Sequence, residues 1–500
     1  MKPKRELGLF DAVMMGLGGA IGFEIFVLLD YAYFILAGSG IILALLLGGL
    51  INLLIMLSYC ELSAAIPEVG GEYTYTKAAY GGLVAFISGC LRWLASVFGA
   101  ALAALTFAQQ LAYFFSIFSP EVQGIVLVEM PLIAIFVVIV LAALDIRGVK
   151  GVGVMIVTAF LAIFAIFVIS GLWSGLAPPE VLPKPLPEGL AGVFAATAYT
   201  FPMFFGMRAL VASVPLIKDP EKNVPRGILL SALLMIPLYF SVAYVAVGVA
   251  SLEKDAHTPL LNFAAEKIMG LAGGFLFAIA GMVANLSALG TSITVQSSIA
   301  RGMSRDGYLP KIFLSVHRHF GTPYVAVIAG SLFIMFLSAT GVVAFLGYAA
   351  SFGSILVFAL VNLSLMKLRK EKPFMKKPFK TPLYPLTPIA GLVMSLVLLT
   401  VPIFLGDVNA INALMSSLGL MSLVLATYYL RMTGRYRLQV AMGGASLGMG
   451  IFGTLLTYLI GTGLVPFTLP HIYLYVLTFV SVVSIVAGVL NISTRTRKIF

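Results

Sequence analysis

The chain carries little charge. Asp, Glu, Lys and Arg together make up 10% of its 500 residues, whereas a soluble globular protein has about 25%. Hydrophobic residues account for 60% of the chain, and the mean hydropathy is +1.06. So few polar groups could not cover the surface of a water-soluble protein. Despite the net charge of +11, the composition therefore excludes a soluble enzyme, a disordered protein and a nucleic-acid-binding domain.

Cysteine and histidine are also scarce. The two cysteines, Cys60 and Cys90, lie inside apolar stretches and form neither a disulfide framework nor a metal-binding pattern. The sequence therefore predicts no catalytic residues, no metal site and no cofactor. The four histidines all fall in loops or at the ends of apolar segments: His257, His317, His319 and His471.

Long segments without a charged residue follow one another along the chain, among them 31–60, 227–252 and 438–494. A helix needs about 20 mostly apolar residues to cross the hydrocarbon core of a membrane. The sequence therefore predicts an all-α polytopic membrane protein with about 14 transmembrane helices. The predicted spans lie near residues 10–36, 39–60, 82–116, 125–144, 151–173, 189–214, 227–250, 272–298, 323–340, 342–366, 383–406, 409–430, 441–462 and 470–491.

The distribution of Lys and Arg predicts the orientation of these spans. With the N-terminus in the cytoplasm, the predicted outer loops contain only Lys184, Lys254 and Lys267, while Arg92 and Arg208 lie within spans. All other Lys and Arg residues fall in inner loops and tails, as the positive-inside rule requires. We therefore expect an integral protein of the cytoplasmic membrane with both termini in the cytoplasm.

Two predicted spans are interrupted by helix-weakening residues and then carry a charge. The first contains GLGGAIGFEIF, in which Glu24 follows Gly22 by two residues; the sixth contains FPMFFGMR, in which Arg208 follows Gly206 by two. Broken backbone at membrane depth is tolerated only where it lines a cavity or is buried in protein, and an ionisable residue there marks a functional site. The breaks are five spans apart, and an odd repeat length inverts the second copy, as in transporters with inverted repeats.

Five motifs resemble the amino acid–polyamine–organocation (APC) permease superfamily and occur in its order. They are Gly18–Phe26, Ser58–Tyr75, Lys218–Arg226, Ala300–Pro323 and Pro378–Pro385. The resemblance covers about residues 7–405 and implies a leucine-transporter-like fold of two inverted five-helix repeats, helices 1–5 and 6–10. It implies a ten-helix core in residues 1–370, with repeats at about 8–175 and 188–370, and a four-helix C-terminal extension in residues 371–500.

The resemblance also implies a secondary active transporter that moves amino acids by alternating access. It places the substrate at the two breaks, where half-helix amides meet a carboxylate and unwound carbonyls meet an ammonium group. Phe201, Phe204 and Phe205 either pack there or gate the pocket. The expected substrate-binding residues are Ala20, Ile21, Gly22, Phe23, Glu24, Phe201, Phe204, Phe205, Gly206 and Arg208.

The charges at the two breaks depart from the family pattern. The family has a small residue and glycine where this chain has Phe23 and Glu24, and often an acidic residue where it has Arg208. Three interpretations stay open for Glu24 and Arg208. They form a structural salt bridge, they orient the substrate, or Glu24 carries a coupling proton after its pKa is raised by desolvation.

The coupling ion is a separate question. A proton is favoured because of Glu24, and sodium or exchange stays open. Some relatives use a helix-5 lysine in place of sodium, but the fifth span has none. A sodium site could use Asn285 and Ser287, which are otherwise helix–helix hydrogen-bonding residues. Arg92 is either a snorkelling or loop-pairing arginine or a substrate or gate residue.

Two alternatives of function also stay open. One is a polyamine or amine carrier or exchanger, and the other is a transport-inactive membrane sensor on the same fold. The expected partners are an amino acid or amine substrate, a coupling ion and the lipid bilayer, without nucleic acid. The sequence does not determine the oligomeric state.

Overall fold

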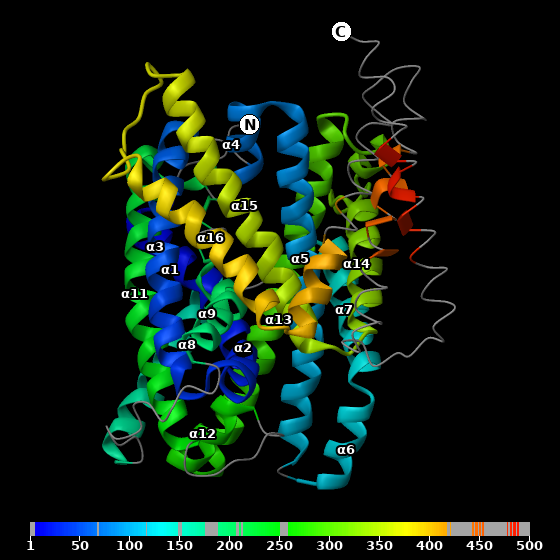
Figure 1. Ribbon diagram of the computed structural model, residues 1–500. Helices are drawn as coiled ribbons and strands as arrows, with labels where there is room; N and C mark the ends of the chain where they lie inside the picture. The colour runs from blue at the N-terminus through cyan, green and yellow to red at the C-terminus, as the bar shows by residue number, and fades with distance from the viewer. Residues whose placement is uncertain are drawn as a thin grey trace.

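The computed structural model describes most of the first 417 residues. The described ranges are 6–67, 70–116, 118–148, 153–175, 189–206, 210–211, 214–250 and 259–417, with isolated helical residues between 421 and 489. Within these ranges the chain consists of helices and their connections, with one isolated parallel bridge between Leu7 and Ile217. The long helices run alongside one another as a bundle (Figure 1).

The first half of the described chain contains two interrupted or bent helical runs and three long helices. Its elements are α1 (Leu9–Ala20), α2 (Glu24–Tyr31), the π-helix η1 (Ala32–Ala37), the 3-10 turn η2 (Gly38–Gly40), α3 (Ile41–Ala65), α4 (Glu72–Tyr80), α5 (Gly82–Ser116), α6 (Pro120–Val128), α7 (Met130–Ile146) and α8 (Gly153–Trp173).

The second half repeats this alternation of broken and continuous helices. Its elements are α9 (Gly189–Thr200), the 3-10 turns η4 (Phe201–Phe204) and η5 (Val214–Leu216), α11 (Pro220–Ala250), α12 (Leu260–Met269), α13 (Leu271–Arg305), the 3-10 turn η6 (Lys311–Leu314), α14 (Tyr324–Ser338), α15 (Val343–Glu371) and α16 (Leu386–Phe404).

Several helices are suited to a membrane. Six helical runs in the described part are long and apolar enough to cross one, or seven if α6 and α7, which are bent by 69°, form one span. Large apolar side chains on the bundle surface, such as Phe136, Ile169 and Phe336, are exposed, as lipid-facing residues would be. The chain is therefore a multi-pass membrane protein. The predicted number of 14 helices is not confirmed, and the spans predicted at 441–462 and 470–491 lie largely outside the described residues.

Helix α5 lies at the centre of the packing. It contacts α13, α15, α4, α7 and α14, while α3 packs against α11 and α1 against α11. Ala100, Ala101, Ala103 and Ala104 on α5 are fully buried, and small side chains let neighbouring membrane helices approach closely. Helix α16 packs on α3, α9 and α15. The predicted division after residue 370 stays a prediction.

The bundle has two chemically different ends. We call the end with α4 and the basic loop 372–382 the α4 end, and the opposite end, where α12 and α6 lie, the α12 end (Figure 1). The first helical run is interrupted between these ends: α1 stops at Ala20 and α2 starts at Glu24. The second interruption follows α9, which tightens into η4 after Thr200.

Candidate functional site

The first break leaves helix ends inside the protein. Ile21 has φ −71° and ψ 85° and so leaves the α-helical region after α1. Glu24 is the first residue of α2, where the amides of the first turn lack intrahelical acceptors and the helix dipole is positive. Its carboxylate folds back over Gly22, because a Cβ there would lie 2.6 Å from Glu24 Oε2. Glu24 thus lies at the end of α2 that would otherwise attract a substrate carboxylate.

The second break packs directly against the first. A Cβ on Gly206 would overlap the carbonyl oxygen of Gly16 and would lie 2.9 Å from the amide nitrogen of Ala20. Only glycine therefore permits this approach of the two backbones. Of the predicted site residues in this segment, Phe201, Phe204 and Phe205 are buried, whereas Arg208 lies outside the described residues.

Tyr239 on α11 joins the two breaks. Its hydroxyl lies 2.7 Å from the carbonyl oxygen of Ala20 and 3.1 Å from that of Met203, and donates its proton to these two acceptors. Both carbonyls are at or near helix ends that lack regular partners. Phe204 covers the tyrosine ring at 5.5 Å between centroids. Sequence reasoning missed Tyr239, because nothing marks one tyrosine among many apolar residues of a span.

A small cavity lies beside the second break. It has a volume of about 10 Å³, which is room for roughly one water molecule. Asn52 on α3 lines it together with Phe204 and Ser231, and among the described residues the Asn52 amide oxygen has no hydrogen-bond partner. A water molecule in this cavity would satisfy that buried acceptor.

Three tyrosines pack together between the breaks and the α12 end. Tyr31 of α2 lies 4.9 Å from Tyr199 of α9, which lies 4.8 Å from Tyr348 of α15, measured between ring centroids. The hydroxyls of Tyr31 and Tyr348 donate to Asp407 Oδ2 at 3.1 and 2.9 Å. We call Tyr31, Tyr199, Tyr348 and Asp407 the tyrosine cluster. Sequence reasoning did not find it, because its members are as much as 376 residues apart.

Asp30 is a second carboxylate at this end that sequence reasoning missed. Its Oδ1 accepts a hydrogen bond of 2.8 Å from the amide of Leu260, the first residue of α12. An oxygen acceptor satisfies one of the amides left free at a helix start. Asp30 therefore ties α12 to the half-helix that begins at Glu24.

Aromatic rings close the other side of the breaks. Phe358 of α15 lies 4.8 Å from Phe205 and 6.2 Å from Phe201, and 5.5 Å from Tyr59 of α3, between centroids. We call Phe201, Phe205 and Phe358 the phenylalanine layer. Beyond it, towards the α4 end, the Tyr59 hydroxyl donates to Glu72 Oε1 at 3.2 Å.

Arg92 belongs to this region. Its Nε lies 3.9 Å from Glu72 Oε1, so the guanidinium lies beside helix α4. Asn285, proposed as a sodium ligand, faces α5 instead of the first break: its Oδ1 accepts from Thr106 at 2.6 Å, and its Nδ2 donates to Gly281 O at 2.8 Å. These are helix–helix and helix-internal hydrogen bonds. Ser287 is exposed on the surface of α13.

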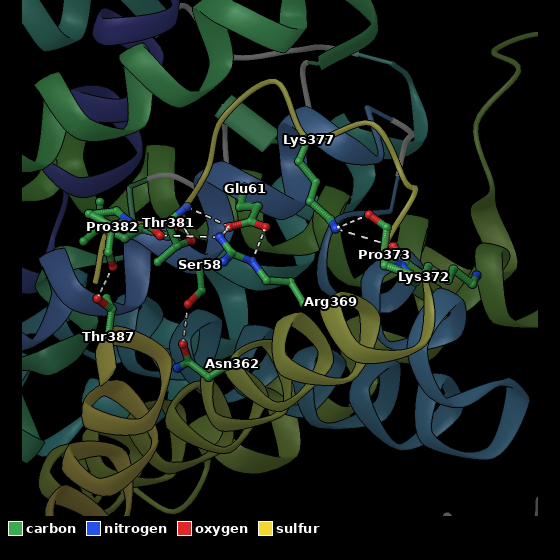
Figure 2. A network of polar contacts seen from close by, with 11 residues as sticks. Ser58, Glu61, Asn362, Arg369, Lys372, Pro373, Lys377, Thr381, Pro382 and Thr387 are labelled. Atoms are coloured by element: carbon green, nitrogen blue, oxygen red, sulfur yellow. Dashed lines mark hydrogen bonds and ion pairs between the residues drawn. The ribbon is translucent and has the colours of Figure 1, made fainter. Parts of the chain in front are cut away.

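Ion pairs hold the elements of the α4 end together. Arg369 donates from Nε and Nη2 to the two oxygens of Glu61, at 2.7 and 2.5 Å, and the Thr381 amide donates to the same carboxylate (Figure 2). The guanidinium also stacks on the Tyr384 ring, 4.0 Å from its centroid. This Glu61 network joins α3, α15 and the loop before α16.

Asp306 forms a second ionic contact at this end. It accepts from Lys77 at 2.7 Å and from Tyr73. Partial burial raises the pKa of Asp306, but the hydrogen bonds from Lys77 and Tyr73 outweigh burial and bring its net pKa below the usual value. Among the described residues, no group of three or more His, Cys, Asp or Glu side chains could hold a metal ion.

One family model and several known proteins match most of this chain. A family model described as "Amino acid permease" matches residues 7–426. The methylthioribose transporter of Bacillus subtilis is 27% identical over 404 residues, which cover 77% of this chain and 86% of the relative. The branched-chain amino acid permease BcaP of the same organism is 28% identical over 422 residues, covering 79% and 88%.

A solved structure is also similar. The inward-facing conformation of Mhp1 covers 80% of this chain and 90% of its own, with 16% sequence identity and a TM-score of 0.49.

Proposed function

The chain belongs to the amino acid permease family of the APC superfamily, and from that premise we propose that it moves amino acids across the cytoplasmic membrane by alternating access. The observation that carries the proposal is the direct contact between the two breaks. Gly206 lies against the end of α1, and Tyr239 bridges Ala20 and Met203. Helix ends from two discontinuous segments therefore meet inside the bundle, the arrangement that secondary transporters use for substrate.

An amino acid offers the groups that such a site binds. The carbonyls of Ala20 and Met203 now accept from Tyr239, and they can accept instead from the ammonium group of the substrate. The free amides of the half-helices can donate to the substrate carboxylate. Glu24 lies at one of these amide sites, so a carboxylate there needs a compensating cation. Arg208, two residues after Gly206, supplies that charge in the proposed site.

The tyrosine cluster and the phenylalanine layer enclose this position from opposite ends. We infer that the α4 end faces the cytoplasm, because it contains the basic loop 372–382 and the positive-inside rule assigns such loops to that side. Alternating access then requires the two closures to open in turn. Coupling to a proton at Glu24 is the accompanying proposal.

The first test is tracer counterflow in proteoliposomes, which needs no ion gradient. The panel contains neutral, acidic and basic amino acids, polyamines and methylthioribose. Accumulation of at least one amino acid by the wild-type protein is the expected result. Uptake of polyamines or methylthioribose alone would overturn the amino-acid assignment, and no flux from folded protein would overturn transport of this panel.

Gly206→Ala tests whether the contact of the breaks matters. The added Cβ overlaps Gly16 O, so we expect transport to fall by tenfold or more, which corresponds to about 1.4 kcal/mol. Gly290→Ala on α13 is the matched control, since a Cβ there meets nothing within 4 Å. Equal activity of the two folded variants would contradict the proposed site.

Glu24→Gln tests the coupling proposal. If Glu24 carries the proton, this variant keeps counterflow but loses the pH dependence of uptake, because exchange at equilibrium needs no net proton movement. If both uptake and its pH dependence survive, Glu24 is neither the proton carrier nor a required substrate contact, and the structural salt bridge is favoured.

A further inference from the structure

Arg92 is a buried cation with a donor nitrogen, Nη1, that no described residue accepts from. Only 9% of the residue is exposed. Its Nε lies 3.9 Å from Glu72 Oε1, which is beyond hydrogen-bond distance, and among the described residues its Nη1 has no hydrogen-bond partner. A guanidinium can donate five hydrogen bonds, and leaving a buried charged donor unsatisfied is costly.

A second arginine at the same end shows how this chain satisfies a structural guanidinium. Arg369 makes two short hydrogen bonds to the two oxygens of Glu61 and stacks on Tyr384. This is the bidentate geometry that arginine forms with a fixed carboxylate. Arg92 does not have it, although Glu72 lies next to it. The contrast means that Arg92 could form closer hydrogen bonds to a carboxylate than it forms with Glu72.

A second buried donor, beside Tyr59, is also unsatisfied. The Tyr75 side chain is fully buried, and within the described part of the chain its hydroxyl has no hydrogen-bond partner. Its ring lies 6.2 Å from that of Tyr59, whose hydroxyl donates to Glu72. Tyr59, Glu72, Tyr75 and Arg92, which we call the Arg92 cluster, thus combine two orphaned donors with one loosely held carboxylate.

The Arg92 cluster lies one aromatic layer away from the breaks. Phe358 contacts Phe205 on one side and Tyr59 on the other, at 4.8 and 5.5 Å between centroids. Helix α5 abuts α15 at this level, because a Cβ on Gly353 would lie 3.3 Å from Leu91 O. A group that displaced Phe358 from the side of the breaks would therefore reach Tyr59 of this cluster.

We propose that Arg92 and Tyr75 form a second binding site, which takes the carboxylate group of the transported amino acid on its way between the breaks and the cytoplasm. Glu72 stands in for that carboxylate while the phenylalanine layer is closed. When the layer opens, the carboxylate replaces Glu72, receives hydrogen bonds from Arg92 and from the Tyr75 hydroxyl, and fills the unused donor positions. This inference depends on the proposed transport of amino acids.

The test measures half-saturating concentrations separately at the two faces of the full-length protein, in vesicles of known orientation. The probe is the amino acid with the largest wild-type counterflow, together with the amine that lacks its carboxylate; for leucine this amine is isoamylamine. Arg92→Gln removes charge-assisted hydrogen bonds, so the half-saturating concentration at the α4 face rises about tenfold or more. The value at the opposite face changes less than twofold, and inhibition by the amine is unaffected.

Glu72→Gln separates this role from a structural one. Removing the carboxylate that competes for Arg92 lowers the half-saturating concentration at the α4 face, the opposite sign to Arg92→Gln. A purely structural ion pair would make both substitutions change transport in the same direction, and that result overturns the proposal. Lys77→Gln is the matched control, because it removes a cation from α4 that pairs with Asp306 outside the cluster, and it leaves both values unchanged.

Tyr75→Phe keeps the proposal testable if the Arg92 variants do not fold. It deletes one hydroxyl that has no described partner and preserves the ring, so folding is retained while the half-saturating concentration at the α4 face rises about two- to tenfold. Equal values for the wild type and Tyr75→Phe overturn the site while leaving transport itself intact. Absence of wild-type flux overturns the transport proposal and this inference with it.

Discussion

The α12 end and the α4 end of the bundle are closed by different chemistry. At the α12 end, the rings of Tyr31, Tyr199 and Tyr348 pack on one another, and two of their hydroxyls donate to Asp407. At the α4 end, carboxylates meet cations, as in Glu61 with Arg369. The α12 end is therefore closed by rings and neutral donors around one carboxylate, whereas at the α4 end ion pairs lie beyond the phenylalanine layer.

This difference separates parts that can move from parts that cannot. A hydrogen bond to a charged group contributes about 1.5–3 kcal/mol, so the tyrosine cluster can open at moderate cost. Removing one partner of a buried, hydrogen-bonded ion pair costs about 3–5 kcal/mol. Glu61 and Arg369 form such a pair, whereas Arg92 lies 3.9 Å from Glu72, beyond hydrogen-bond distance. We infer that the Glu61 network is a fixed scaffold and that movement at the α4 end occurs at the phenylalanine layer and the Arg92 cluster.

The largest expected effect comes from breaking the Glu61 network. Arg369→Met leaves the Glu61 carboxylate buried without its cation, which we expect to cost about 3–5 kcal/mol of stability. Thermal unfolding in detergent micelles measures the loss. Lys376→Met is the control, because its pair with Glu221 is 80% and 42% exposed and such pairs contribute about 0–1 kcal/mol. Similar shifts in the two variants would contradict the scaffold interpretation.

The sequence was sufficient to predict the local features of this architecture. Glycines before Glu24 and the segment around Pro202 indicated interruptions of two spans, and the helices do end at Ala20 and tighten after Thr200. Both signals are local, because glycine and proline weaken a helix wherever they occur. The family motifs predicted the membership that the family model shows.

The partnerships across the bundle could not be predicted in this way. Asp407 meets Tyr31 and Tyr348 only because α2, α15 and the start of the segment after α16 converge. Asn285 carries an amide that suits either a cation or a neighbouring helix, and packing against Thr106 of α5 decided which partner it found. Arg208, the residue on which the proposed charge pair depends, lies outside the described residues.

The tyrosine cluster gives the next largest prediction. Asp407 also accepts from the amides of Asn409 and Ala410, and an asparagine in its place would keep such capping while losing the charge that holds the tyrosine hydroxyls. We expect Asp407→Asn to favour the state open at the α12 end by about 1.4 kcal/mol, or tenfold. The measurement is the labelling rate of Ile21→Cys by a membrane-impermeant thiol reagent, against the low background of buried Cys60 and Cys90.

A control distinguishes the hydroxyl contacts of Asp407 from a general destabilisation of the α12 end. Tyr348→Phe removes one of the two donors to Asp407 and should raise labelling by a smaller factor than Asp407→Asn. Tyr33→Phe removes a hydroxyl from a neighbouring ring that packs on Phe34 and should leave labelling unchanged. If Tyr33→Phe raised labelling as much as Tyr348→Phe, the hydroxyl contacts of Asp407 would not be what keeps the α12 end closed.

The smallest expected effect concerns Asp306 and depends on pH. Its folded-state pKa is lowered, because the hydrogen bonds from Lys77 and Tyr73 outweigh burial. A carboxyl with a lowered folded pKa stabilises the protein above its unfolded pKa of about 3.9, and this contribution is lost as the pH falls through the folded value. Lys77 is 47% exposed, so solvent screening limits the effect to about 1 kcal/mol or less.

Wild type and Asp306→Asn should therefore differ in thermal unfolding by a constant small amount from pH 7 to pH 5, and the difference should vanish at more acidic pH. A difference that persists unchanged at pH 3 would mean that Asp306 stabilises the α4 end through packing and not through its charge, and the ionic description of this end would then apply to the Glu61 network alone.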